Sequence, residues 1–509
     1  MYSKTNTTSL IGLDGRLVEV ESDITSGMPK FNIVGLPDSS INEAKDRVRV
    51  ALINSGYRFP PGRITINLSP ADLKKEGTQL DLPIAISLLG SMGVIEKNLD
   101  DFIYLGELAL DGRILPIRGA LAMVISMREQ GFRKFIISED NKDECAIISD
   151  IEVYPFDKLV EVVGFVNGES NKEAYKANPA LLVDESGFDF DFKDLKGQED
   201  LKRALQIAAA GSHNLLMIGA PGSGKTFAAK HLPSILPDMS FEEKVEVTKI
   251  YSIMGLLDSG KLVNKRPFRS PHHSSSQVAL IGGGHSVPRP GEITLAHRGV
   301  LFLDEFPEYQ KNVIEALREP LENKEINVAR AQASVKYPAD FILIAAMNPC
   351  PCGNYGNPVK ECTCSQNEIR RYLNKISSPI LDRIDIHIEI KPVKYEDLKD
   401  DGKSKSSSEL KSEVVRARKI QELRYKDENV KTNGLLSTKQ MKKYIHLSPD
   451  LEKIGQMAFS KYNFSVRSFN KILKMARTIA DLEDSKEILA KHLLEAIRYR
   501  SLDGKYWSN

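Results

Sequence analysis

Patterns of apolar residues typical of strands alternate with patterns typical of helices along the first 170 residues of the chain. Strict alternation of apolar and polar side chains predicts a strand at 63–68, and short apolar-rich runs predict strands at 17–21, 31–34 and 134–137. Apolar side chains at helical spacing predict helices at 41–55, in the segment that opens at 77–84, and at 120–130. Asp111-Gly112 predicts the turn of a hairpin over 106–117. This pattern predicts an α+β domain over residues 1–170.

The pattern changes after residue 170. Residues 171–190 are polar and irregular and predict a linker, while 191–395 contain uncharged apolar runs that predict the buried strands of an α/β core. A Lys-, Asp- and Ser-rich stretch over 396–412 predicts a solvated connector. The last part, 410–509, predicts a helical lid with helices at 414–425, 437–444, 449–461, 465–481 and 486–499. The fold class expected is therefore α/β and multidomain.

A glycine-rich segment follows the apolar run 215–218 and precedes a helical pattern. The order strand, glycine loop and helix is the context of a phosphate-binding loop, in which backbone N–H groups and the helix N-terminus face the phosphates. In this motif the lysine reaches the β- and γ-phosphates and the following hydroxyl binds Mg²⁺. The alternative is a plain glycine-rich turn. The predicted nucleotide-binding residues are Gly219, Ala220, Pro221, Gly222, Ser223, Gly224, Lys225 and Thr226.

Two further polar groups end apolar strands. Asp304 and Glu305 follow the uncharged run 299–303, and Asn348 follows the run 341–347. Carboxylates at such strand ends hold Mg²⁺ and orient or deprotonate water, so Asp304 is the expected metal ligand and Glu305 the expected catalytic residue. Asn348 can hold the attacking water near the γ-phosphate. Taken alone, each is also an ordinary end of a buried strand.

Composition bounds what the chain can be. It has 509 residues, 41% of them hydrophobic, and 70 lysines and arginines balance 69 acidic residues to a net charge of +1. That length predicts several domains. Because the net charge is close to zero, any binding of nucleic acid must use local basic patches on the surface. No apolar run reaches the length of a membrane span, and the N-terminus has no apolar signal core. We therefore expect no membrane association and a cytoplasmic location.

Four of the five cysteines fall within fifteen residues, in a Pro- and Gly-rich stretch. Cys350, Cys352, Cys362 and Cys364 can supply the four thiolates of a structural Zn²⁺ site. Two disulfides are the alternative, which a reducing cytoplasm disfavours. The fifth cysteine, Cys145, is expected to be a small buried side chain.

The segment between the two nucleotide motifs is rich in basic residues and histidine. His272 and His273 are adjacent, which suits shared metal ligation poorly, so a flexible insertion that faces a partner is preferred to a metal site. Farther on, 326–331 and 335–337 predict a hairpin that carries Arg330 and Lys336 near its tip, as candidate DNA contacts.

Arg383 lies between a short helix and a strand and can act as a catalytic arginine that reaches the γ-phosphate bound by a neighbouring subunit. The alternative is a salt bridge with Asp382 or Asp385 of the same chain.

In this order, the motifs resemble AAA+ ATPases. The stretches RPFRSPHHSSS (266–276), GGGHSVPRPGEITLAHRGVLFLDE (282–305) and NPCPCG (348–353) narrow the resemblance to the magnesium chelatase-like ComM/YifB family, over nearly the whole chain. The resemblance implies that Asn348 is sensor 1 and Arg467 is sensor 2, which leans on the nucleotide of its own subunit. It also implies that Leu195 and Gly197 lie near the adenine.

The stretch GELALDGRILPIRGAL (106–121) resembles the proteolytic domain of Lon-type proteases. The resemblance implies the fold and not the activity, because the Ser–Lys dyad is missing. Residues 76–81 contain no serine, and Leu121 stands where the lysine would fall. The domain is therefore expected to serve assembly or DNA contact.

The family resemblance implies ATP and Mg²⁺ as cofactors and a homo-oligomer, expected to be a hexamer, acting on single-stranded or branched DNA. The function expected is that of a DNA helicase that promotes branch migration in recombination and natural transformation, where recombination proteins are partners. Two alternatives stay open: a chelatase-type motor and a protein-remodelling AAA+ ATPase.

Overall fold

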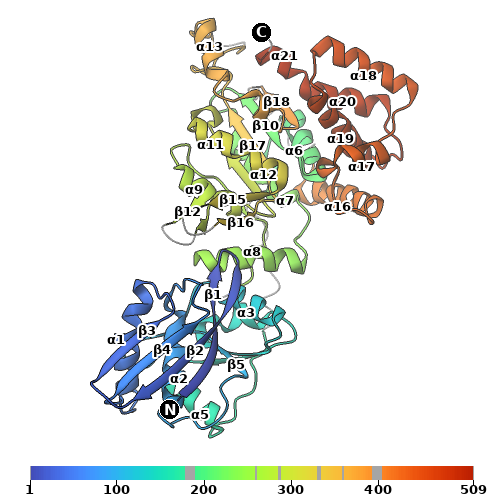
Figure 1. Cartoon of the computed structure of the whole chain (residues 1–509). Coiled ribbons are helices and arrows are strands. Elements are labelled where there is room, and N and C mark those ends of the chain that lie inside the picture. The colour runs from blue at the N-terminus through green and yellow to red at the C-terminus, as the bar shows by residue number, and fades with distance from the viewer. Residues whose placement is uncertain are drawn as a thin grey trace. The chain divides into compact units, whose positions relative to one another are not determined.

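The computed structural model describes residues 2–177, 190–257, 261–284, 288–329, 334–357, 360–391 and 404–507 (Figure 1). The chain divides into two compact units that alternate along the sequence. Unit 1 comprises Met1–Glu185 and Ser240–Asn264, and unit 2 comprises Ser186–Met239 and Lys265–Asn509. Residues 178–189 of the expected linker (171–190) and residues 396–403 of the expected connector (396–412) lie outside the described residues.

Unit 1 is built on a seven-stranded mixed sheet with the strand order β3-β4-β2-β1-β5-β8-β9. The strands are β1 (Tyr2–Ile11), β2 (Asp14–Thr25), β3 (Lys30–Val34), β4 (Arg63–Ser69), β5 (Phe102–Tyr104), β8 (Lys134–Ser138) and β9 (Glu152–Phe156). β1 pairs antiparallel with β2 and parallel with β5. The predicted hairpin is present as β6 (Glu107–Leu108) and β7 (Ile114–Leu115).

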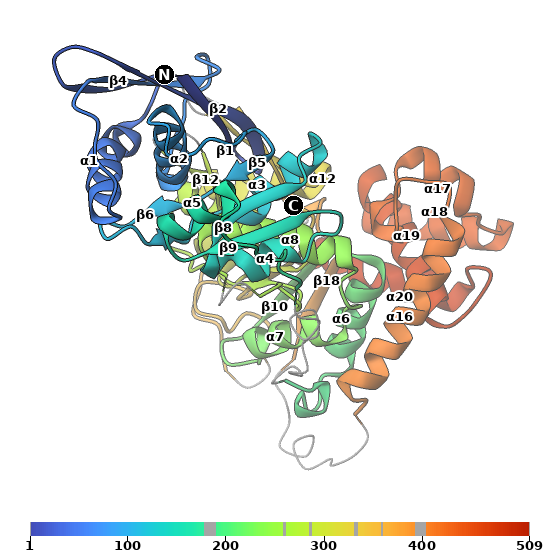
Figure 2. The same cartoon turned by 90° about the horizontal axis from the view of Figure 1, so that it is seen from below.

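Helices cover both faces of this sheet. The apolar side chains of α1, α2 and α5 pack with one set of strand residues, and those of α3 and α4 pack with the alternate set. Figure 2 shows α1 and α2 side by side next to β4 and β2. The helices are α1 (Ser39–Asn54), α2 (Asp81–Ser91), α3 (Ala120–Glu129), α4 (Lys142–Ala146) and α5 (Leu159–Asn167). The predicted strands and helices of this region are confirmed, but β1, β5, β9, α4 and α5 were not predicted.

A helix from later in the chain completes unit 1. This helix, α8 (Phe241–Met254), lies in sequence between two strands of unit 2. Its Ser252 carbonyl accepts a hydrogen bond from the Gly119 N–H (3.1 Å), and its Ser252 hydroxyl donates to the buried Glu144 carboxylate (2.6 Å). Leu262, beyond the helix, packs with the buried Leu121. The segment Ser240–Asn264 is thus an integral part of unit 1.

Unit 2 contains a five-stranded parallel sheet with the order β11-β14-β17-β10-β18. Its strands are β10 (Leu215–Gly219), β11 (Phe268–Arg269), β14 (Val300–Leu303), β17 (Ile342–Met347) and β18 (Ile386–Ile390). Because all five run the same way, their carboxyl ends meet along one edge, where α/β sheets bind ligands. The predicted mixed α/β architecture is confirmed, and the sheet at its core is parallel.

Helices and two hairpins surround this sheet. The helices of the core are α6 (Glu199–Gly211), α7 (Lys225–Ile235), α9 (Gln277–Ile281), α10 (Glu292–Leu295), α11 (Lys311–Ala316), α12 (Arg318–Asn323), α13 (Gln366–Leu373) and α14 (Ser378–Leu381). The hairpins are β12 (Gly282–Gly283) with β13 (Arg289–Pro290), and β15 (Glu325–Ala329) with β16 (Ser334–Pro338). The latter confirms the hairpin predicted from the sequence.

The C-terminal helices pack on α6 and α7 and share one apolar core with the sheet (Figure 1). They are α16 (Ser407–Arg424), α17 (Thr438–Tyr444), α18 (Pro449–Tyr462), α19 (Val466–Leu482), α20 (Ala490–Arg500) and α21 (Leu502–Tyr506). The helix predicted at 414–425 begins seven residues earlier, inside the expected connector, because Ser406 and Glu409 form a capping box there. The last predicted helix begins at Ala490 instead of residue 486.

A buried arginine joins these helices to the core. Arg500, 1% exposed, donates hydrogen bonds to the Ile384 carbonyl (2.6 Å) and to the Ser468 hydroxyl (2.9 Å). It also donates to the Leu381 carbonyl, so it braces both ends of the turn that carries Arg383. Within the described part of the chain, no helix is both long and apolar enough to cross a membrane.

Candidate functional site

The glycine-rich loop connects β10, which lies between β17 and β18, to α7. Gly222 and Gly224 have φ angles of 74° and 83°, which side chains other than glycine rarely adopt, and Lys225 is the first residue of the helix. The loop therefore directs the N-terminus of α7 toward the edge where the parallel strands end. That geometry favours an anion at this position.

The acidic pair lies directly opposite this helix start. Asp304 follows β14, and its Oδ2 accepts a hydrogen bond from the Thr226 hydroxyl at 2.6 Å. A hydroxyl and a carboxylate at this separation are two oxygen ligands of the kind that Mg²⁺ prefers. Glu305 adopts a left-handed backbone conformation with a φ of 50°, which residues other than glycine rarely adopt.

Asn348 reaches the same place from β17. Its Oδ1 accepts a hydrogen bond from the Lys225 Nζ at 3.2 Å, although the two residues are 123 positions apart in the sequence. The Lys225 ammonium also donates to the carbonyls of Gly219 (2.7 Å) and Ala220 (3.0 Å). Burial lowers the pKa of Lys225, while the charges of Asp304 and Glu305 raise it. The structure thus brings Lys225, Thr226, Asp304 and Asn348 together.

Two features of the loop fit a phosphate-bearing ligand. The Ser223 hydroxyl is buried and has no hydrogen-bond partner in the described structure. A buried polar group without a partner is costly, and a phosphate oxygen would satisfy it. The Gln198 side chain donates to the Ser223 carbonyl (2.9 Å) and so holds the loop from the segment predicted to lie near the adenine. Leu195 of that segment is buried, and Gly197 precedes Gln198.

His273 contacts Glu305, a pairing that the sequence did not indicate. The His273 Nδ1 lies 2.9 Å from the Glu305 Oε2. Phe268–Arg269 forms the edge strand β11 beside β14, so the residues that follow it arrive beside the acidic pair. Phe268 and Arg269 of the predicted insertion thus belong to the sheet, and Arg269 is held there by Glu292 (2.6 Å), while the residues that follow, 271–276, form turns and irregular backbone. Only the contact pattern of the fold could have identified His273.

The two predicted catalytic arginines lie together, around Glu322 of α12. Arg383 donates a hydrogen bond to the Glu322 carboxylate and another to the Pro379 carbonyl (2.7 Å). Arg383, Arg467 and Lys471 all lower the pKa of Glu322, with the Arg383 hydrogen bond as the largest cause. The expected alternative, a salt bridge of Arg383 with Asp382 or Asp385, is not formed in the described structure. Nor does Arg467 contact the glycine-rich loop among the described residues.

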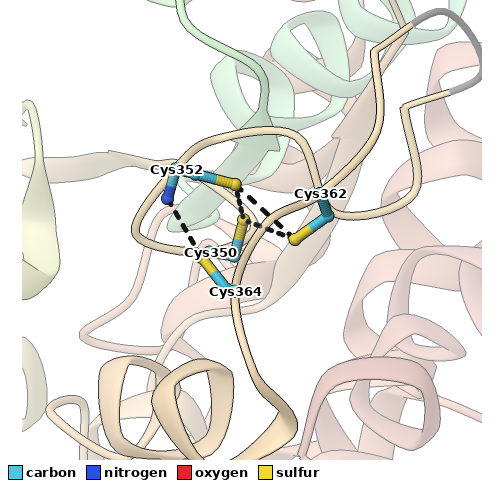
Figure 3. A group of neighbouring side chains, drawn as sticks. All are labelled: Cys350, Cys352, Cys362 and Cys364. Carbon is cyan, nitrogen blue, oxygen red and sulfur yellow. Dashed lines mark hydrogen bonds between the residues drawn. The ribbon is translucent and has the colours of Figure 1, made fainter.

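Four cysteine thiols converge after Asn348 (Figure 3). The Sγ atoms of Cys350, Cys352 and Cys362 lie 3.4, 3.5 and 3.6 Å apart, and the Cys364 Sγ completes a group within 4.8 Å. A disulfide needs about 2.05 Å, so these sulfurs are not bonded to one another. Tetrahedral Zn–S bonds of about 2.3 Å place sulfurs about 3.8 Å apart, so the group fits that ion.

Backbone N–H groups point at the sulfurs, as they do around metal-bound thiolates. The Cys350 Sγ accepts from the Tyr355 N–H (3.3 Å) and the Cys364 Sγ from the Cys352 N–H (3.4 Å). Hydrogen bonding from the Asn354 N–H lowers the pKa of the Cys352 thiol to about 5. Cys145 is fully buried in unit 1, as expected, and burial raises its pKa.

Of the two candidate DNA contacts, Lys336 is described and Arg330 lies outside the described residues. Lys336 is 70% exposed on β16, and its Nζ pairs with the Glu325 carboxylate at 3.3 Å. The register pairs Ala329 with Ser334 at the far end of the hairpin, so Lys336 lies two residues from that end. The inward-facing side chains of the two strands are apolar and buried.

In unit 1, the positions that hold the Ser–Lys dyad in Lon-type proteases are occupied by residues of other types. Leu121 is fully buried in an apolar cluster, and Gln79 donates to the Glu76 carbonyl (2.7 Å). The nearby Lys75 ammonium is buried and donates to the carbonyls of Gly35 (3.1 Å), Leu68 (3.0 Å) and Pro70. A lysine held by three carbonyls is not available to activate a nucleophile.

Comparison with known proteins bears on the whole chain. Family models match residues 191–398 (Magnesium chelatase, subunit ChlI), 20–141 (Subunit ChlI of Mg-chelatase) and 404–500 (Magnesium chelatase, subunit ChlI C-terminal). The uncharacterized protein YifB of Escherichia coli is 42% identical over 501 residues, which cover 98% of this chain and 97% of YifB. The competence protein ComM of Haemophilus influenzae is 40% identical over 500 residues, 97% and 96% of the two chains.

A partial similarity to a protease is also present. Lon protease 2 of Bacillus subtilis is 31% identical over 188 residues, which make up 31% of this chain and 33% of the protease.

Proposed function

The chain belongs to the magnesium chelatase-like AAA+ ATPases of the ComM/YifB family, and from this membership we propose that it is an ATP-driven motor that acts on DNA. The observation that carries the proposal is the 2.6 Å contact between the Thr226 hydroxyl and Asp304 at the start of α7. It joins the hydroxyl of the glycine-rich loop to the acidic strand end, the two protein ligands that a nucleotide-bound Mg²⁺ requires. The unpartnered Ser223 hydroxyl supports a phosphate beside them.

Each residue of the site has a role in this proposal. Residues Gly219 to Thr226 hold the phosphates, and Lys225 neutralises their charge. Bound Mg²⁺ supplies further positive charge, held by Thr226 and Asp304. Glu305 orients and deprotonates the attacking water, and Asn348 positions that water near the γ-phosphate.

His273 is proposed to position the catalytic carboxylate. Its Nδ1 engages only the Oε2 of Glu305, which leaves the Oε1 free of that contact for a water molecule. His273 does not contact the loop that holds the phosphates, so its effect is expected on the chemical step and not on nucleotide binding.

Arg383 is proposed to act at the nucleotide of a neighbouring subunit, and Arg467, as sensor 2, at the nucleotide of its own subunit. They share one region around Glu322, and neither contacts the glycine-rich loop in the described structure. The Arg383 guanidinium, brought to the γ-phosphate from a neighbouring subunit, would complete a site that is open in a single chain. This requires a homo-oligomeric ring, which we propose to be a hexamer.

DNA is the proposed substrate, since one relative at 40% identity is a competence protein. Lys336 is exposed on a hairpin, and Arg330 follows the described part of the same hairpin. Cations of this kind bind the phosphate backbone, without selecting a base sequence. The finer proposal is helicase activity that promotes branch migration in recombination and natural transformation.

A chelatase-type or protein-remodelling motor is the alternative. The family descriptions favour the first, and the partial similarity to a Lon protease favours the second. Both would use the same nucleotide site, so only the substrate distinguishes them.

The four cysteines are proposed to hold a structural zinc ion. All four ligand positions of a tetrahedral ion would be filled by thiolates, so no position is left for a catalytic water.

We expect the wild-type protein to migrate a synthetic four-way DNA junction in the presence of ATP and Mg²⁺. Glu305→Gln keeps the shape of the side chain but removes the base, so it should bind nucleotide normally while ATP hydrolysis falls at least ~100-fold and junction migration stops. Gel analysis of junction products tests this. Hydrolysis by wild type without DNA stimulation or junction movement would favour the chelatase-type or protein-remodelling alternative.

His273→Ala should lower kcat for ATP hydrolysis about 10- to 100-fold, the effect of losing one hydrogen bond to a charged group, with nucleotide affinity unchanged. His273→Asn, whose amide can replace the Nδ1 donor, should restore part of the rate. His272→Ala is the matched control, because His272 bonds to Ser274 (2.7 Å) and not to Glu305. A rise in kcat in His273→Ala would mean that His273 restrains Glu305 and does not position it.

Replacing both hairpin cations, Arg330→Ala with Lys336→Ala, should weaken DNA binding several-fold. It should also make the dependence of affinity on salt less steep, by about one unit of slope for each phosphate that the protein no longer neutralises. Lys453→Ala, on α18 with a side chain 74% exposed, is the control for loss of an exposed lysine away from the hairpin, and it is compared with Lys336→Ala alone. Unchanged DNA binding and unchanged DNA-stimulated ATPase in the double variant would contradict the hairpin proposal.

Metal analysis of protein washed with a weak chelator should return about one zinc per chain. Cys350→Ser should lose it, whereas Cys145→Ser, in unit 1, should retain it. Wild-type protein that contains no zinc after expression in zinc-supplemented medium would remove the metal site from the proposal.

A further inference from the structure

The cysteine turn begins two residues after Asn348. β17 ends at Met347, Asn348 contacts the Lys225 ammonium at 3.2 Å, and Cys350 follows with its side chain fully buried. Two residues of extended chain span at most about 7 Å. The position of the Cys350 backbone therefore limits where the Asn348 side chain can lie.

The same turn packs against the glycine-rich loop. A Cβ atom added to Gly353 would lie 2.5 Å from the Pro221 Cδ and 2.8 Å from the Pro221 Cγ. Contacts under 3.0 Å do not occur between real atoms of these kinds, so only glycine lets the two backbones come this close. Gly353 also has a φ of 79°, and its N–H donates to the Cys350 carbonyl (3.0 Å). The turn thus lies against the loop on one side and leads directly from Asn348 on the other.

Regular structure does not stabilise this turn. Between β17 and α13, the described residues form only turns, bends and irregular backbone. Cys362 and Cys364 approach Cys350 and Cys352 from the far side of the turn, and the sulfur contacts of 3.5 and 3.6 Å join the two sides. Four thiols in van der Waals contact hold a loop weakly, whereas one ion bound by all four is a rigid cross-link.

We infer that a metal ion held by the four cysteines braces both Pro221 of the glycine-rich loop and Asn348, so that nucleotide affinity depends on occupancy of the cysteine site. The inference rests on the proposed nucleotide site and on the proposed zinc site, and it adds a regulatory link between them. Loss of the ion would make the turn mobile, and Pro221 and Asn348, which the turn holds beside the phosphate site, would then no longer be fixed in position. The ligand of the cysteine site is a soft, tetrahedral cation, for which zinc is the probe.

The experiment uses the full-length protein and measures zinc content and the Kd of a fluorescent ATP analogue on the same samples. Cys362→Ser with Cys364→Ser removes two ligands from the side of the turn that does not contact the loop. We expect it to lose the zinc and to bind the nucleotide about tenfold more weakly. Wild-type protein stripped by a strong chelator should show the same loss, and re-added zinc should reverse it.

A pair of glycine variants tests the contact between the cysteine turn and the glycine-rich loop without removing any ligand of the metal. Gly353→Ala keeps all four thiols but introduces the Cβ that meets Pro221, so it should retain zinc and bind nucleotide more weakly. Gly356→Ala is the matched control: its φ of 75° imposes similar strain, but no atom lies closer than 4.0 Å to its added Cβ. It should retain both zinc and nucleotide affinity.

The outcomes distinguish the inference from the proposals beneath it. Zinc lost with nucleotide affinity unchanged, in both the cysteine variant and the stripped protein, would overturn the inference and leave the nucleotide and zinc proposals standing. Equal nucleotide affinity in Gly353→Ala and Gly356→Ala would overturn the contact with Pro221 as its route. Wild-type protein that binds nucleotide but no zinc would overturn the zinc proposal and this inference together, whereas zinc without nucleotide binding would overturn the proposed function.

Discussion

Parallel pairing of β10 between β17 and β18 is the constraint on which the site depends. Ile218 of β10 lies opposite Met347 of β17, and Leu303 of β14 lies opposite Ala345, so the residues that follow these strands emerge at one level. Hydrogen bonding between backbones therefore places Lys225, Asp304 and Asn348 together before any side chain interacts. The side-chain contacts then refine an arrangement that the sheet already imposes.

Much of this arrangement could be predicted, because each of its residues ends a conspicuous apolar strand. The glycine-rich loop, the acidic pair and Asn348 are local patterns, and the parallel sheet is the usual way to bring such strand ends together. The cysteines were equally visible as a cluster in the sequence. The hairpin that carries Lys336 followed from two alternating runs with a polar stretch between them.

The parts that could not be predicted depend on long-range packing. β1 is rich in Ser and Thr and shows no alternation of apolar residues, yet Thr5, Thr7 and Thr8 are fully buried in the sheet. Some of these buried hydroxyls form hydrogen bonds, such as the one that Thr5 donates to the Pro83 carbonyl (3.1 Å). No pattern in the sequence predicts these bonds. His273 reaches Glu305 only because β11 is the edge strand of the sheet. The shared position of Arg383 and Arg467 likewise depends on how α19 packs on the core.

The segment Ser240–Asn264 returns to unit 1 after the chain has entered unit 2, and this affects how the protein can be divided into fragments. Cutting the gene at residue 190 would not yield an independent ATPase fragment, because Ser240–Asn264 would keep its apolar side chains and lose Leu121, Glu144 and Gly119, with which it packs. Such a fragment would expose apolar surface and aggregate for reasons unrelated to catalysis. The part played by unit 1 can therefore be learned from surface substitutions or from co-expressed halves that restore those contacts, but not from deletion.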